Sequence, residues 1–143
     1  MKIELGKVKK VFFIGIGGIG ISALAKWAKA QGMEVSGVND EEGKTVDLLR
    51  EAGIEVMSKT VFNTLPEVDI YVYSDAWLHR GPEILEMAKN TGKPVLSYAE
   101  ALGEFAKNYK VIAISGTHGK TTTTAMVAYI LIEAGLDPTV VVG

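Results

Sequence analysis

The chain of 143 residues contains no cysteine. This absence excludes disulfide bonds, thiolate metal sites and a cysteine nucleophile, and it fits a reducing compartment. There is no surplus of positive charge either, because 15 Lys and Arg against 17 Asp and Glu give a net charge of −2. Nucleic-acid binding through bulk electrostatics is therefore not expected, although local basic pockets remain open.

No apolar run is long enough to cross a membrane, which takes about 20 residues. Residues 11–25 form an uncharged stretch behind the basic segment MKIELGKVKK, an arrangement that also occurs in secretory signal peptides. However, Glu4 lies within the basic segment, and four glycines at Rossmann-like spacing interrupt the uncharged stretch. We therefore expect a cytoplasmic protein that does not associate with membranes.

The rest of the composition, with 48% hydrophobic and 22% charged residues, is ordinary for a soluble globular protein. Short apolar runs alternate with segments of helical periodicity, such as Leu24, Trp27 and Ala28 ahead of Gly32. The expected strands are residues 10–15, 34–38, 54–57, 69–74, 93–97, 110–115 and one that starts at 138. The expected helices are residues 20–32, 45–53, 81–92, 98–108 and 120–135.

Repeated β-α-β units predict an α/β fold, a Rossmann-like and mostly parallel sheet with helices on both faces. A second strand–glycine loop–helix unit begins just after Asn108. We therefore predict a first domain over residues 1–108. Residues 109–143 would form the first strand, phosphate-binding loop (P-loop) and helix of a second α/β domain.

The first glycine-rich loop, GIGGIG, follows a predicted strand and opens a predicted helix. Gly15, Gly17 and Gly20 have GxGxxG spacing, with Gly18 in addition. In this motif the first glycine permits a tight turn, the second lets the backbone approach a pyrophosphate, and the third lets helix and strand pack closely. The helix N-terminus then presents free N–H groups to the anion.

An NAD(P)-binding oxidoreductase domain is one hypothesis that this loop supports. Such a domain would place an acidic residue at the end of the second strand for the ribose hydroxyls, and Asp40 lies about 20 residues beyond the loop. The residue at the strand end itself is more simply Asn39. This hypothesis leaves the second loop without a role.

The second loop, GTHGKTTTT, also follows an apolar run and opens a helix. Lys120 is placed to reach β- and γ-phosphate oxygens, and the Thr121 hydroxyl to bind Mg²⁺. Backbone amides of residues 116–122 would cradle the phosphates. Four β-branched threonines at a helix start are otherwise hard to explain, since threonine is a mediocre helix former. The loop is shorter than the general P-loop, because Ile114 stands where that pattern has glycine.

Together the two loops resemble the Mur ligase family. The matching segments are GIGGIG at 15–20, VSG at 35–37, YS-A at 73–76, PEI at 82–84, GTHGKTTTTAMVA at 116–128 and AGLDPT at 134–139. The short GTxGKT form is the most specific of these. The resemblance covers essentially the whole chain.

The resemblance implies an ATP-dependent ligase of three domains, which bind a UDP-sugar, bind ATP, and close over both. The reaction phosphorylates the carboxylate of UDP-N-acetylmuramate, and the amine of L-alanine then attacks the acyl phosphate to form an amide. Carried over by position, the UDP-binding residues are Gly15, Gly17, Gly18, Ile19, Gly20, Asn39, Ser74, Asp75 and Ala76. The ATP-binding residues are Gly116, Thr117, His118, Gly119, Lys120, Thr121 and Thr122, with Lys120 catalytic and Thr121 on Mg²⁺.

Several alternatives stay open at this point. The family usually has aspartate where this chain has Asn39, and Asp75 adds a negative charge near an anionic ligand. A sister ligase that attaches a peptide to UDP-N-acetylmuramate in cell-wall recycling shares most of these motifs. A non-catalytic nucleotide-binding module is a third hypothesis. We expect the chain to be an N-terminal part that is inactive alone, and its apolar last helix to be covered by the first domain or by a second copy.

Overall fold

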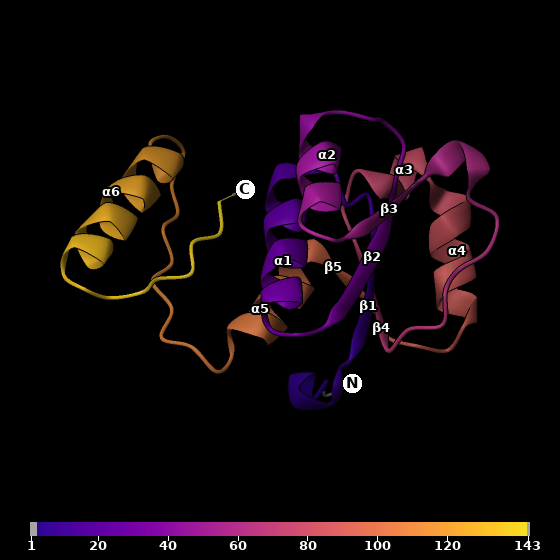
Figure 1. The fold of residues 1–143 in the computed structure, drawn as a ribbon, viewed down its shortest axis with the longest axis horizontal. Helices are drawn as coiled ribbons and strands as arrows, with labels where there is room; N and C mark the ends of the chain where they lie inside the picture. Colours follow the sequence, from indigo (N-terminus) through magenta and orange to yellow (C-terminus); the bar gives the residue numbers. More distant parts are fainter. Residues whose placement is uncertain (1–2, 143) are drawn as a thin grey trace.

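The computed structural model describes residues 3–142 and contains a five-stranded, fully parallel sheet with the strand order β3-β2-β1-β4-β5 (Figure 1). The predicted α/β fold with a Rossmann-like sheet is therefore confirmed. The strands are β1 (Lys10–Ile14), β2 (Glu34–Asn39), β3 (Glu55–Ser58), β4 (Ile70–Tyr73) and β5 (Val95–Ser97). The α-helices are α1 (Ile19–Ala30), α2 (Lys44–Glu51), α3 (Trp77–Arg80), α4 (Pro82–Asn90), α5 (Tyr98–Ala106) and α6 (Lys120–Glu133), with short 3₁₀ turns at Leu5–Lys7 and Lys59–Val61.

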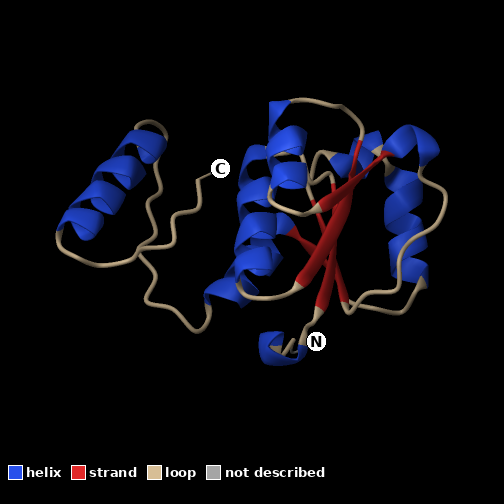
Figure 2. Ribbon diagram, in the orientation of Figure 1, coloured by secondary structure: helices blue, strands red, loops and turns tan. Residues whose placement is uncertain are grey.

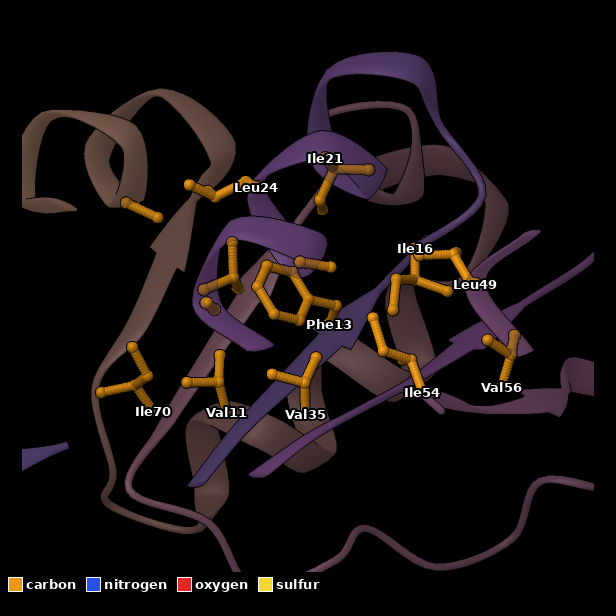
Figure 3. Packing of buried hydrophobic residues seen from close by; sticks show 14 of the residues in the cluster. Val11, Phe13, Ile16, Ile21, Leu24, Val35, Leu49, Ile54, Val56 and Ile70 are labelled. Atoms are coloured by element: carbon orange, nitrogen blue, oxygen red, sulfur yellow. The ribbon is translucent and has the colours of Figure 1, made fainter. Parts of the chain in front are cut away.

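The central strand β1 is buried on both faces, which explains its continuous apolar sequence. Val11 and Phe13 point into the core under α1, α2 and α5, together with Leu24, Leu49 and the other residues of Figure 3. Phe12 and Ile14 point to the opposite core, where α3 and α4 cover the sheet. The alternation of strand side chains thus supplies two hydrophobic layers from one apolar run.

Local signals set several helix boundaries. Helix α4 begins with proline at its first position, and α5 begins with a capping box in which Ser97 and Glu100 satisfy each other's backbone amides. Helix α3 was not expected from the sequence. Its first residue, Trp77, is buried on the sheet, so packing rather than propensity explains this single turn.

The sequence-based prediction of strands at 110–115 and from 138 onward is wrong for the described residues. Both segments are irregular, shown as tan loops in Figure 2, and pair neither with each other nor with the sheet. A strand requires a neighbour that accepts and donates its ladder hydrogen bonds, and residues 3–142 offer none there. Gly143 lies outside the described residues.

Helix α6 forms as predicted, but none of its residues is buried. The expectation that the first domain would cover this helix is therefore wrong for the described residues. Met126, Tyr129, Ile130 and Ile132 each expose more than half of their surface. Among the helices that the structure describes, none is long and apolar enough to span a membrane.

Candidate functional site

The carboxyl end of β1 is the topological switch point of the sheet. From β1 the chain proceeds to β2 and β3 on one side, and later to β4 and β5 on the other. Ligands of open parallel sheets bind in the crevice at such a point, because the loops that follow the two neighbouring strands diverge there. The GIGGIG loop follows β1, and residues 74–76 follow β4. The topology therefore brings together two of the segments that were predicted from the sequence to bind UDP.

Most amides of the GIGGIG loop are already used within the protein. The N–H groups of Gly15 and Ile16 donate to the Val38 carbonyl at 2.8 and 3.2 Å, and the Gly18 N–H donates to the Gly15 carbonyl at 3.3 Å. The Gly17 N–H donates to Asn39 Oδ1 at 3.1 Å. These four amides are therefore not free for a ligand.

The free amides lie one step further along, in the first turn of α1. The Ser22 N–H closes the first helical hydrogen bond on the Gly18 carbonyl. The N–H groups of Ile19, Gly20 and Ile21 consequently have no acceptor among residues 3–142, and Gly18 offers no side-chain cap. Together with the positive end of the helix dipole they form a seat for an anion.

Three of the four loop glycines, Gly15, Gly17 and Gly20, are required by a specific neighbour. Gly15 has a φ of +80°, and a Cβ built on it would lie 2.3 Å from the Trp77 ring. A Cβ on Gly17 would lie 2.5 Å from the Asn39 amide. A Cβ on Gly20 would lie 2.8 Å from the Tyr98 hydroxyl of α5. The prediction that Gly20 serves the packing of helix on strand is thus corrected, because its neighbour is a second helix.

Residues 74–76 form the opposite wall of the switch point. The Ser74 N–H continues the sheet by donating to the Ile14 carbonyl at 3.0 Å, and the Ser74 carbonyl accepts from the Trp77 N–H at 2.8 Å. Asp75 and Ala76 are exposed in the turn between them. Trp77 directly follows this turn and is buried, and its ring lies against the backbone of Gly15.

Several residues near the switch point were missed by sequence reasoning. Arg80 bridges from α3 to the turn after β2, with Nη1 3.2 Å from Asp40 Oδ2 and 3.8 Å from Glu41 Oε1. Lys59 pairs with Glu83 at 3.1 Å and lies over the Trp77 ring. No motif of the sequence indicated these contacts, since they join residues that are 18 to 40 positions apart. Asp40, the acid considered for an NAD ribose, is instead engaged by Arg80.

The second glycine loop also leaves three first-turn amides free, although its N-cap glycine differs from the extended Gly18 in backbone conformation. Gly119 adopts the left-handed conformation at φ +78° and directly precedes α6. The Thr123 N–H donates to the Gly119 carbonyl at 2.9 Å, so the amides of Lys120, Thr121 and Thr122 have no acceptor among residues 3–142. Lys120 Nζ folds back onto the Gly116 carbonyl at 2.8 Å.

The two loops are separate sites in this structure. The first turn of α6 and the carboxyl ends of the strands lie towards the same upper edge of Figure 1, but α6 stands apart from the sheet. Thr117 and His118 are exposed in the second loop. Within residues 3–142 no group of three or more His, Asp or Glu side chains is placed to hold a metal ion.

A profile described as the Mur ligase family, catalytic domain, matches residues 10–110 of the chain. The chain belongs to the Mur ligase family. The resemblance drawn from the two loops is therefore confirmed. The UDP-N-acetylmuramate–L-alanine ligase of Trichlorobacter lovleyi is 44% identical to this chain over 138 residues, which cover 96% of the chain and 30% of that relative.

Solved structures of Mur ligases share the fold. The UDP-N-acetylmuramate–alanine ligase of Thermotoga maritima matches with a TM-score of 0.77 and 34% identity, over 88% of this chain and 30% of that one. The UDP-N-acetylmuramate:L-alanyl-gamma-D-glutamyl-meso-diaminopimelate ligase of Neisseria meningitides matches with a TM-score of 0.75 and 34% identity, over 90% of this chain and 40% of that one. The chain thus spans about a third of the length of its relatives.

Proposed function

We propose that this chain supplies the UDP-sugar site and the first part of the ATP site of a ligase that joins L-alanine to UDP-N-acetylmuramate. The free amides of residues 19–21 at the switch point are the observation that supports this proposal most directly, because they form an anion seat at the place where a parallel sheet binds nucleotides. The names of the relatives at 44% identity supply the substrate. We further propose that residues 1–108 form the UDP-sugar domain and that residues 109–143 begin the ATP domain in the cytoplasmic enzyme.

The geometry divides the UDP-sugar between two walls. The first turn of α1 would hold the diphosphate, whose negative charge is stabilised by three amides and the helix dipole. Ser74, Asp75 and Ala76 would face the sugar or the nucleoside, since uncharged hydroxyl groups are acceptable partners for the Asp75 carboxylate. The residue at the end of β2 is Asn39, which is not an acid, and both polar atoms of its amide form hydrogen bonds within the protein. The strand end therefore offers no carboxylate for the ribose of NAD.

The second loop fits ATP and Mg²⁺ by its donor set. Three free amides and the Lys120 ammonium are suited to phosphate oxygens, and the exposed Thr121 hydroxyl is suited to Mg²⁺, which prefers oxygen ligands and takes many of them from water and phosphate. Bound ATP and Mg²⁺ would supply a phosphoryl group with reduced negative charge. Lys120 is the residue we assign to neutralising that charge.

A sister ligase is the second candidate function. The structural match to the Neisseria enzyme, whose name specifies a tripeptide, is as high in identity as the match to the L-alanine ligase of Thermotoga. Both proposals share the UDP-N-acetylmuramate site. They would be separated by assaying the longer gene product, if one is encoded, with L-alanine and with the tripeptide.

Calorimetric titration of the 143-residue protein tests the UDP-N-acetylmuramate site that both proposals share. We expect UDP-N-acetylmuramate and UDP to bind, and NADH not to bind. Amide chemical shifts should change at Ile19, Gly20 and Ile21 on adding UDP-N-acetylmuramate. Binding of NADH alone, or shifts confined to residues far from α1, would refute the proposal.

The ATP half is tested with Lys120→Ala. If the protein binds ATP, this substitution should abolish that binding because the only loop cation proposed for the phosphates is lost, whereas the affinity for UDP-N-acetylmuramate should not change. Lys110→Ala, which removes a cation outside the loop, is the matched control. A parallel loss of both ligands in Lys120→Ala would contradict two separate anion sites.

A further inference from the structure

Asn39 is the last residue of β2 and stands beside the carboxyl end of β1. Its side chain is partly buried and turns towards the GIGGIG loop rather than towards solvent. Oδ1 accepts from the Gly17 N–H at 3.1 Å, and Nδ2 donates to the Glu41 carbonyl at 2.7 Å. An asparagine amide accepts through Oδ1 and donates through Nδ2 at once, and the two partners fix its orientation.

The contact between Asn39 and Gly17 also explains why position 17 is glycine. A Cβ there would lie 2.5 to 2.9 Å from the three atoms of the Asn39 amide group, and so would displace it. The sequence motif attributes this glycine to the approach of a pyrophosphate. In this structure the space is occupied by a protein side chain instead.

Asn39 belongs to a turn that is held from the other side as well. Asp40 pairs with Arg80 of α3, and Glu41 lies 3.8 Å from the same guanidinium. Glu42 of the same turn pairs with Arg50 of α2, so the turn carries ion pairs on both sides. Exposed ion pairs of this kind contribute little to stability, so the two hydrogen bonds of Asn39 are the more specific link.

We propose that Asn39 is a positioning residue for the UDP site: it occupies the Gly17 amide and thereby holds the loop so that the first-turn amides of residues 19–21 face the diphosphate. This inference rests on the proposed function, and it replaces the assignment of Gly17 and Asn39 as direct ligand contacts. The essential feature at position 39 is an acceptor for the Gly17 N–H. Aspartate would preserve that acceptor while losing the donation to the Glu41 carbonyl, and leucine, of similar size, would lose both hydrogen bonds.

The test compares Asn39→Asp, Asn39→Leu and Gly17→Ala in the 143-residue protein, with Asn63→Asp and Asn63→Leu as controls in an exposed loop. Affinity for UDP-N-acetylmuramate is measured by calorimetry. Protection of the Gly17 amide is measured by hydrogen exchange in the free protein. We expect Asn39→Leu to bind about tenfold more weakly, because it loses the hydrogen bond that holds the Gly17 amide together with the one to the Glu41 carbonyl, and to lose Gly17 protection. Asn39→Asp should stay within about threefold of the parent and keep that protection.

Gly17→Ala should weaken binding as Asn39→Leu does, because both break the same contact. The double variant should then be no weaker than either single variant, since effects through one contact do not add. Full additivity, or parent affinity in a folded Asn39→Leu protein, would overturn the positioning role while leaving the proposed function intact. Failure of the parent protein to bind any UDP compound would instead remove the proposed function and this role together.

Discussion

Two units of this chain share one local plan, an apolar segment followed by a glycine-rich turn and a helix. In the first unit, residues 10–30, the apolar segment is a strand between two parallel neighbours, and its side chains are fully buried. In the second unit, residues 110–133, the apolar segment is irregular and its helix has no buried residue. Both helices nevertheless begin with free amides after a glycine.

The difference between the units shows which features are local and which are not. A helix satisfies its own backbone hydrogen bonds, so α6 forms without a neighbour. A strand requires hydrogen-bond partners from elsewhere in the chain, so the segment 110–115 remains irregular and unpaired among the described residues. The anion seat needs only the helix start and the glycine, and therefore appears in both units. Coverage of the apolar face of α6 by a second copy stays a prediction.

The largest contrast between the units should appear in core substitutions. Phe13→Ala removes a side chain with 0% exposure and should lower the free energy of unfolding by about 3–5 kcal/mol. Ile112→Ala, at 63% exposure in the second unit, should change it by less than about 0.5 kcal/mol. Urea denaturation followed by far-UV circular dichroism measures both, with Phe13→Leu as a milder variant. Equal losses would mean that the second unit is packed in solution.

A second contrast uses three glycines with positive φ. Gly15→Ala should destabilise by at least about 2 kcal/mol, because backbone strain of about 1–3 kcal/mol adds to a Cβ placed 2.3 Å from the Trp77 ring. Gly32→Ala, at φ +87° with open space around it just after the first unit, measures the backbone strain alone. Gly119→Ala has a similar φ and open space, but should leave the main transition unchanged because α6 contributes no buried residue. A loss in Gly119→Ala equal to that in Gly32→Ala would show that the units unfold together.

Much of the sheet and of the helices that pack on it could be predicted because the signals are local. The apolar run of β1, the glycines that end helices and the proline at the start of α4 each specify an element without reference to distant residues. The strands of residues 110–115 and 138–142 were predicted wrongly for the same reason, since apolar β-branched residues indicate a strand whether or not a neighbour exists. Helix α3 was not predicted because Trp77 is held by packing against two glycines. One of them, Gly81, is four residues away, but the other, Gly15, is more than 60 residues away in the sequence.

In the candidate site, too, the features set by local sequence could be predicted and those set by distant residues could not. The glycine spacing located both loops and both helix starts, since that pattern encodes turn geometry directly. It did not indicate which amides remain free, because that depends on Val38 and Asn39 from the neighbouring strand. Nor did it place Tyr98 against Gly20, a contact between two helices. The assignment of individual ligand-binding residues stays a prediction.

The smallest expected effect concerns Asp69, which ties the start of β4 to the start of β1. Its carboxylate accepts from the Lys9 and Lys10 N–H groups at 2.8 and 2.9 Å, and these hydrogen bonds lower the pKa of the carboxyl group. Because the pKa is lower in the folded than in the unfolded chain, the stabilisation is fully present above the unfolded value of about 3.9 and is lost as the pH falls through the folded value. The second unit has no comparable hydrogen bond from a carboxylate to a distant backbone amide among the described residues.

The variant Asp69→Asn tests this contribution. Its free energy of unfolding should be about 1 kcal/mol lower than that of the parent protein at pH 7, and this difference should disappear as the pH is lowered below about 4. Urea midpoints from pH 7 to pH 3 measure this, with Glu67→Gln as the exposed control. A gap for Asp69→Asn that is independent of pH would show that the carboxylate charge has no part in holding β4 to β1.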